Sequence, residues 1–157
     1  MKQFWKIWII FVLVWGPLWG MEDTIADQSV SKSFLIVKST KSYIEAKNFA
    51  QNLAKKSDIK LDLRGLDYNK EIMLTYTDTE CNKNNFGYPC YVARGRYDNG
   101  VYLSVESSDA YEGFTKGYYI VVAASMEKID KSLLYRMKRY VPDAYVKHTS
   151  VYMGCIH

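Results

Sequence analysis

The pattern that decides the fold is clearest in residues 117–152, GYYIVVAASMEKIDKSLLYRMKRYVPDAYVKHTSVY. Gly117–Ala124 is an apolar run of the kind found in buried strands. Apolar residues then recur at helical spacing over Ile129–Tyr140, and Pro142 stops the helix. Ala144–Met153 alternates and predicts a last strand. The stretch therefore predicts a strand–helix–strand unit.

A second unit of this kind lies nearer the N-terminus. Ser33–Lys38 is a compact apolar strand, and Ser42 with Glu45 forms the capping box of a helix over 42–56. Ile59–Leu63 alternates and predicts a second strand. Two such units usually build one sheet with both helices on one face. We therefore expect a single α+β domain over 33–157, with the other sheet face free to bind a ligand.

The region between the two units, residues 69–116, is predicted to be an insertion. It contains three strand-like runs, IMLTY, CYVARGRY and VYLSVES, and Asp98-Asn99-Gly100 predicts the turn of a β-hairpin. Ser108–Phe114 is short enough to form one helical turn. Tyrosine is concentrated in and just after the insertion, with seven from Tyr88 to Tyr119.

Two of the three cysteines are expected to pair, because the chain is predicted to be exported. Cys81 and Cys90 flank the loop-like segment NKNNFGYP and are the first choice. The alternative is that Cys155 pairs with one of them and pins the tail to the domain.

The N-terminus predicts export. In residues 1–20 a short basic start precedes the apolar run Ile7–Trp15, and Pro17 and Gly20 follow. This is the layout of a secretory signal peptide, and the run is shorter than the ~20 residues that span a bilayer. Residues 21–32 form a polar leader. We expect a periplasmic or cell-envelope location, with membrane attachment only if the segment remains uncleaved.

Charge and motifs exclude several functions. The net charge is +4 and falls to +2 without Lys2 and Lys6, too little for a nucleic-acid binder driven by phosphate contacts. Hydrolase, metalloprotease and phosphate-loop motifs are absent, so an enzyme is not expected. No cofactor or metal is expected either, since Cys155, His157 and His148 fall short of the four ligands of structural zinc.

Two segments, residues 34–56 and 118–148, resemble the SPOR domain, the sporulation-related repeat of bacterial envelope proteins. VPDAYVKH, which leads into the last strand, is the most specific part of the likeness. The chain has Lys38-Ser39-Thr40 where family members usually have Gly-Ser-Phe. The resemblance implies a SPOR-like, ferredoxin-like βαβ–βαβ antiparallel sheet with two helices on one face. It also implies peptidoglycan glycan strands stripped of their peptides as the ligand.

The candidate binding residues follow from this resemblance and from the hairpin. Rings and apolar side chains at matching positions of the two halves are expected on the open sheet face, namely Phe34, Ile36, Tyr119 and Val121. Alternatively, they form core under the helices. The predicted hairpin adds Arg94, Arg96, Tyr97 and Tyr102, which either face a ligand with carboxylates or lie on an ordinary solvated surface.

Three functions remain open at this point. The first is an exported, non-catalytic protein that binds peptidoglycan glycan strands. The second is an exported inhibitor or immunity-type protein that blocks another envelope protein, such as a wall hydrolase, through the hairpin. The third is an interaction domain of SPOR-like fold that has lost sugar binding.

Overall fold

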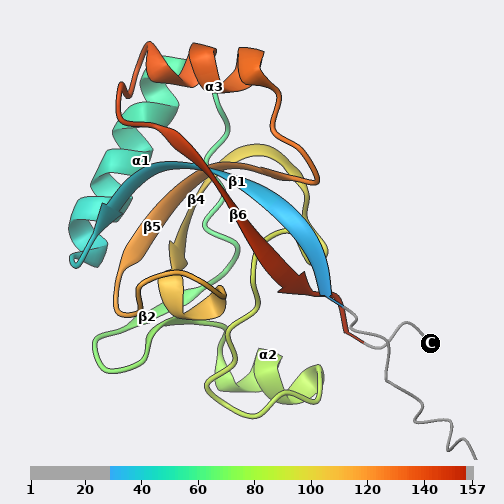
Figure 1. Ribbon diagram of the computed structural model, residues 1–157. Helices are drawn as coiled ribbons and strands as arrows, with labels where there is room; N and C mark the ends of the chain where they lie inside the picture. Colours follow the sequence, from blue (N-terminus) through green and yellow to red (C-terminus); the bar gives the residue numbers. More distant parts are fainter. Residues whose placement is uncertain (1–28, 155–157) are drawn as a thin grey trace, which may run out of the picture.

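The computed structural model describes residues 29–154, which form a four-stranded antiparallel sheet with strand order β4-β5-β1-β6 (Figure 1). The strands are β1 (Ser29–Thr40), β4 (Gly100–Ser107), β5 (Tyr119–Met126) and β6 (Tyr145–Tyr152). The predicted α+β class is confirmed. β1 starts within the expected leader, because Ser29 to Ser33 pair with the second half of β6. The signal peptide, the rest of the leader and Cys155 lie outside the described residues.

The two long helices are α1 (Tyr43–Ser57) and α3 (Lys131–Lys138), close to their predicted positions. Ser42 caps α1, since its hydroxyl accepts a hydrogen bond from the Glu45 N–H at 3.3 Å. In a complete capping box the Glu45 carboxylate would accept a hydrogen bond from the Ser42 N–H, but here each group has another partner. The Ser42 N–H donates to the Thr40 hydroxyl at 3.2 Å, and the Glu45 carboxylate pairs with Lys38 at 2.8 Å.

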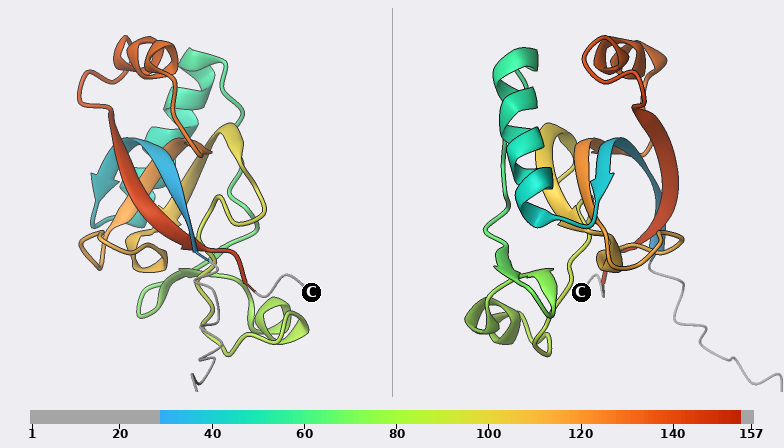
Figure 2. Two further views of the ribbon diagram at one scale, coloured as in Figure 1. Left: turned by 45° about the vertical axis from the view of Figure 1, so that its right-hand side comes forward. Right: turned by 90° about the vertical axis from the view of Figure 1, so that its left-hand side faces the viewer.

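The main core lies between the helices and the sheet. Both helices contribute to it, so one face of the sheet is covered as predicted (Figure 2). Its buried members include Leu35, Val37, Ala46, Ala50, Leu53, Val121, Leu133 and Met137.

The predicted strand at Ile59–Leu63 is wrong. Leu61 makes only an isolated parallel bridge to Leu103, with hydrogen bonds of 2.7 and 2.8 Å on either side. The fourth sheet strand is β4, from the region predicted to be an insertion. β4 buries five consecutive residues on both faces of the sheet, whereas the three apolar side chains of IKLDL alternate with charged ones and suit only one face, so β4 is the better strand. Lys60–Asp62 instead covers part of the outer edge of β4.

The predicted hairpin around Asp98-Asn99-Gly100 is also wrong. β4 pairs with β5, and residues 90–97 form no strand. The turn is closed by a side chain: the Gly95 N–H donates to the Asp98 carboxylate at 3.0 Å. Gly95 has a φ of +93°, and a Cβ there would lie 2.5 Å from the Ser125 hydroxyl oxygen. The chain therefore folds back on itself before β4 begins.

A lobe extends beyond one end of the sheet (Figures 1 and 2). It follows the small pair β2 (Asp67–Asn69) and β3 (Met73–Thr75) and contains α2 (Asp78–Lys83). We call residues 76–99 the disulfide lobe, because Cys81 and Cys90 are bonded within it, as predicted. Among residues 29–154, no helix is long and apolar enough to cross a membrane.

Candidate ligand-binding groove

The four predicted sheet residues do not share a face. Phe34 and Ile36 lie on the side away from the helices, whereas Tyr119 and Val121 belong to the helix-side core. The two halves match with a shift of 84 positions, which pairs Phe34 with Tyr118 instead of Tyr119. A slip of one residue moves every side chain of a strand to the opposite face. The prediction of a common face is therefore wrong.

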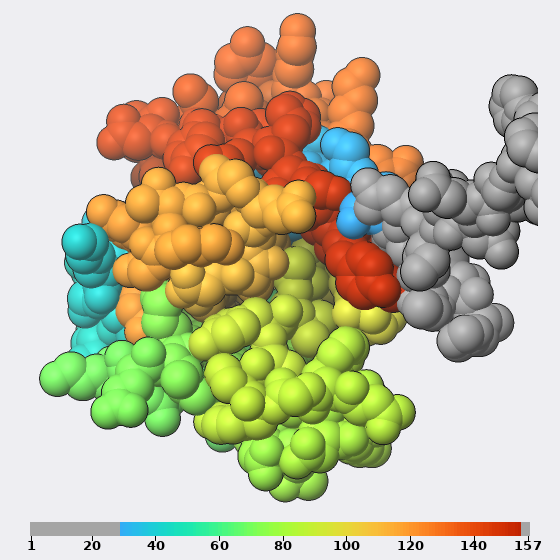
Figure 3. Space-filling view, turned by 60° about the horizontal axis from the view of Figure 1, so that its bottom comes forward, coloured from blue at the N-terminus to red at the C-terminus, as the bar shows by residue number. Residues whose placement is uncertain are grey.

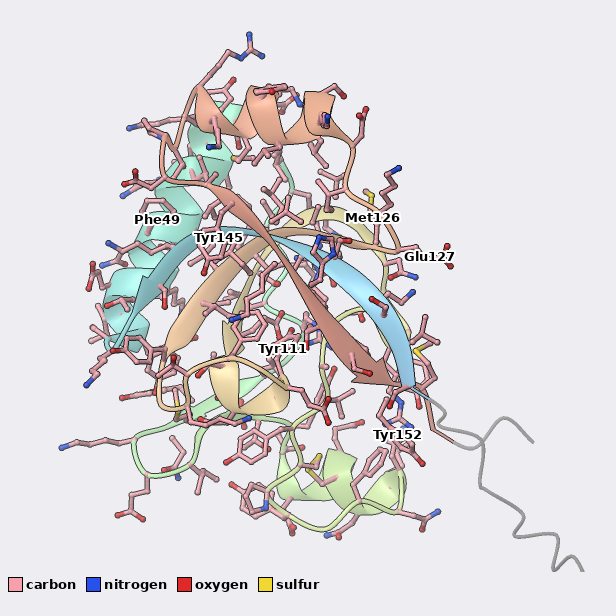
Figure 4. The ribbon with its side chains drawn as sticks, in the orientation of Figure 1. Phe49, Tyr111, Met126, Glu127, Tyr145 and Tyr152 are labelled. Atoms are coloured by element: carbon pink, nitrogen blue, oxygen red, sulfur yellow. A yellow bond between two sulfur atoms is a disulfide. The ribbon has the colours of Figure 1, made fainter. Side chains whose placement is uncertain are left out.

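The sheet face away from the helices is not free either. It is covered by the segment after β4, which includes the short helix η1 (Ser108–Ala110) and places Tyr111 in the interior of the molecule (Figure 4). The ring of Tyr111 meets Phe34 edge-on at 5.1 Å and Phe114 at 5.3 Å. Phe34 and Ile36 are completely buried in this second core. The alternative that these rings form core is thus the observed one.

Tyr119 is buried among tyrosines on the helix side. Its ring lies 5.7 Å from Tyr43 and 6.1 Å from Tyr68, which also stack on each other at 4.5 Å. The pKa of Tyr119 is raised to about 12. Burial is the larger cause, and the neighbouring Tyr68 is the next. This ring supports packing between α1 and the sheet and is closed to a ligand.

Arg94 is also an internal residue. It is fully buried, donates at 3.0 Å to the Ser104 hydroxyl and the Val122 carbonyl, and donates to the Gly100 carbonyl at 2.9 Å. Its guanidinium carbon lies 3.4 Å from the centre of the Tyr102 ring. Burial lowers the pKa of Arg94 and raises that of Tyr102. Both predicted hairpin residues are therefore used to fix the loop before β4 to the sheet.

A second arginine completes this buried cluster. Arg64 pairs with Asp98 at 2.7 Å and with Glu106 at 2.6 Å. Burial alone would lower the pKa of Arg64, but the two carboxylates raise it. The Tyr102 hydroxyl donates to Asp98 at 2.7 Å. Two arginines and two carboxylates thus form one cluster, of which Asp98 is 32% exposed at its side chain, and the contacts of the cluster are with the protein's own groups.

The remaining predicted residues, Arg96 and Tyr97, lie in a surface groove of the disulfide lobe. A hollow of about 380 Å³ is lined by residues that include Tyr76, Glu80, Asn84, Phe86, Arg96 and Tyr97. A second hollow of about 140 Å³ is lined in part by Tyr91, Glu112, Ser150 and Tyr152. Val92 and Arg96 line both. We call the two hollows together the Arg96 groove. Figure 3 shows the lobe beside the C-terminal end of β6.

The Arg96 guanidinium is surrounded by aromatic rings. Its central carbon lies 4.9 Å from the ring centre of Tyr97, 5.2 Å from Phe86 and 5.4 Å from Tyr152. Gly154 lies so close that a Cβ there would be 2.2 Å from the Arg96 Nη2 atom. Within residues 29–154, Arg96 makes no hydrogen bond or ion pair, and its Nε is buried without a partner.

The disulfide joins the two walls of the larger hollow. Cys81 lies in α2, whose neighbours Glu80 and Asn84 form one wall, and Cys90 precedes Val92 and Arg96 on the other. The Cys90 N–H donates to the Thr75 hydroxyl at 3.0 Å, and that hydroxyl donates to the Cys90 carbonyl at 2.8 Å. The groove is therefore held by a covalent bond and by two hydrogen bonds to β3.

Sequence reasoning missed several groove residues. Phe86 lies in the segment between the cysteines, and Tyr152 ends the last strand, more than 50 residues from Arg96. The excess of tyrosine in the insertion was a usable signal for the lobe, but nothing local linked it to Tyr152. A third hollow of about 250 Å³, lined in part by Tyr118, Tyr145 and Lys147, lies apart from the groove and was not predicted.

Comparisons with protein-family models, with curated proteins and with solved structures find no match to this chain. No group of three or more His, Cys, Asp or Glu side chains suited to a metal occurs in residues 29–154.

Proposed function

We propose that this protein is an exported, non-catalytic cell-envelope protein that binds peptidoglycan glycan strands in the Arg96 groove. The observation that carries the proposal is the pair of adjoining hollows that share Arg96 and Val92 and are bordered by tyrosine rings. Two adjoining hollows bordered by aromatic rings suit a linear polymer better than a compact metabolite.

The side chains of the groove fit sugars. Tyrosine has an apolar ring that packs under the flat face of a sugar and a hydroxyl tip that reaches its polar groups. Tyr97 is 75% exposed and Tyr152 is 52% exposed, so both rings are accessible. Asn84 and Glu80 add polar atoms that can hydrogen-bond to sugar hydroxyls.

The fold proposal is a SPOR-like, ferredoxin-like domain with a displaced binding site. The strand order β4-β5-β1-β6, with α1 after β1 and α3 after β5, supports the βαβ–βαβ arrangement. In this proposal the sheet face is filled by the protein's own segment around Tyr111. The ligand is therefore proposed to bind at the disulfide lobe instead of on the sheet face.

The disulfide supports the export part of the proposal, because such bonds persist mainly in oxidising compartments. The signal-like residues 1–20 point the same way. Periplasmic or envelope localisation is tested by fractionating cells that express the full chain.

A sedimentation assay tests glycan binding. Full-length protein is mixed with insoluble sacculi, intact or stripped of peptides, and the pelleted fraction is measured. We expect preferential pelleting with stripped sacculi and about a fivefold or greater loss for Tyr97→Ala and Tyr152→Ala, by analogy with the roughly 1–3 kcal/mol that one stacked ring contributes to binding a nucleic-acid base. Tyr135→Ala is the matched control, because Tyr135 is 66% exposed on α3. Absence of pelleting in every preparation would refute the proposal.

A second candidate is an inhibitor of another envelope protein. The disulfide lobe extends beyond the sheet, is cross-linked, and exposes Tyr88 at 46% outside the groove lining (Figure 2). This candidate expects Tyr88→Ala to weaken the interaction, whereas glycan binding is expected to tolerate that change. Inhibition of a wall hydrolase by the protein, without sacculus binding, would favour it.

A further inference from the structure

Three arginines lie in or near the disulfide lobe, and their surroundings differ. Arg64 is neutralised by Asp98 and Glu106. Arg94 donates from its two terminal nitrogens to a hydroxyl and two carbonyl oxygens, although its Nε, like that of Arg96, is buried without a partner. Arg96 has neither kind of partner within residues 29–154 and lines the groove. Arg96 is therefore the arginine whose hydrogen-bonding capacity remains available to a ligand.

The rings around Arg96 leave it suited to an anion. Tyr97, Phe86 and Tyr152 attract the guanidinium through their ring faces, but they accept no conventional hydrogen bonds from its N–H groups. A guanidinium presents parallel N–H donors in the spacing of a carboxylate, so a bidentate pair is the natural complement.

Two acidic residues limit where an anion can lie. Glu80 lines the larger hollow and Glu112 the smaller one, on either side of the shared Arg96. Like charges repel, so the negative group of a ligand is favoured at Arg96, and neutral groups are favoured in the two hollows. This pattern fits a polymer with acidic groups spaced along a largely neutral chain.

We propose that Arg96 binds the free carboxylate of an acidic sugar in the glycan strand, with neighbouring sugars in the two hollows. The inference rests on the proposed function and adds the chemical group that is recognised. A sugar carboxylate joined to a peptide has become an amide and has lost its charge, so it no longer forms the ion pair. The groove therefore discriminates between free and substituted acids.

Chemically altered sacculi test this inference. Full-length protein is sedimented with peptide-stripped sacculi and with the same material after its carboxyl groups are reduced to alcohols. We expect binding to the reduced material to be about tenfold to a hundredfold weaker, the effect of losing a charged hydrogen-bonded pair. Added salt should weaken binding only to the unreduced material.

Substitutions at Arg96 provide the second part of the test. Arg96→Gln should bind both materials equally and weakly, and Arg96→Lys should recover part of the preference, since it keeps the charge and loses the bidentate geometry. Arg139→Gln, at an exposed position after α3, is the control and should behave as the unaltered protein. Circular dichroism establishes that each variant is folded.

The outcomes separate the two proposals. Equal binding of the unaltered protein to both materials overturns the carboxylate inference and leaves glycan binding standing. Binding to neither material overturns glycan binding itself. If Arg96→Gln keeps the full preference for unreduced material, the carboxylate is recognised elsewhere and the inference is wrong. Arg96-dependent binding to an acidic protein, with no glycan bound, would likewise overturn it.

Discussion

Replacing Arg64 with methionine should strongly destabilise the fold. Arg64 is 6% exposed at its side chain and pairs with Asp98 and with Glu106, which is 1% exposed. The variant keeps the apolar stem but leaves the Glu106 carboxylate buried without its ion pair. Breaking a buried pair in this way costs about 3–5 kcal/mol. For a domain of this size, that corresponds to a fall in Tm of roughly 10–20 °C.

Urea denaturation at pH 7, followed by circular dichroism, measures the effect. The double variant Arg64→Met with Glu106→Gln should recover part of the stability. Lys60→Met is the control, since Lys60 and Asp62 are exposed and 3.6 Å apart, and we expect a change below about 0.5 kcal/mol. A loss below about 1 kcal/mol at pH 7 for Arg64→Met would refute the reasoning.

Three further predictions concern the lobe and the second core. Replacing Cys81 and Cys90 with serine should cost about 2–3 kcal/mol of unfolding free energy, the value for a closed loop of this length, and an unchanged urea midpoint would contradict it. Phe34→Ala should cost about 3–5 kcal/mol, because the ring is completely buried against Tyr111; a small change in thermal melting would mean that the second core is not packed as described. Gly154→Ala should displace Arg96 and weaken sacculus binding, with some loss of melting temperature because Gly154 has a φ of +81°, and full binding would show that the close approach is not required.

Strands and helices with a strong local pattern were predictable. The apolar run near Val121, the cap at Ser42 and the helix stopped before Pro142 all depend on residues close in sequence. The partner of each strand was not predictable in the same way. Ile59–Leu63 has a good alternation, yet β4 takes the sheet position because it pairs with β5 along its length and buries more surface. Local periodicity contains no information about that competition.

The site was only partly predictable for a related reason. Arg96 and Tyr97 were identified as members of the predicted hairpin, but Arg94, two residues from Arg96, is buried, because the loop folds back onto β4 and β5. Arg94 and Arg96 have the same charge and, two residues apart, the same place in an alternating pattern. The sequence alone therefore does not separate the buried arginine from the one that lines the groove. Tyr152 enters the groove only through the pairing of β6 with β1.

That pairing also decides how the domain can be tethered. Ser29 lies opposite Tyr152, and both line the smaller hollow, so the chain enters and leaves the domain at one rim of the groove. If the N-terminal segment stays in the membrane, residues 21–28 can hold Ser29 no farther than about 28 Å from its end, the span of eight extended residues. An anchored copy would then sample only the polymer nearest the bilayer, whereas a released copy could reach the whole thickness of the wall. If the protein has the proposed envelope location, cleavage of the segment would thereby set which layer of the envelope it occupies.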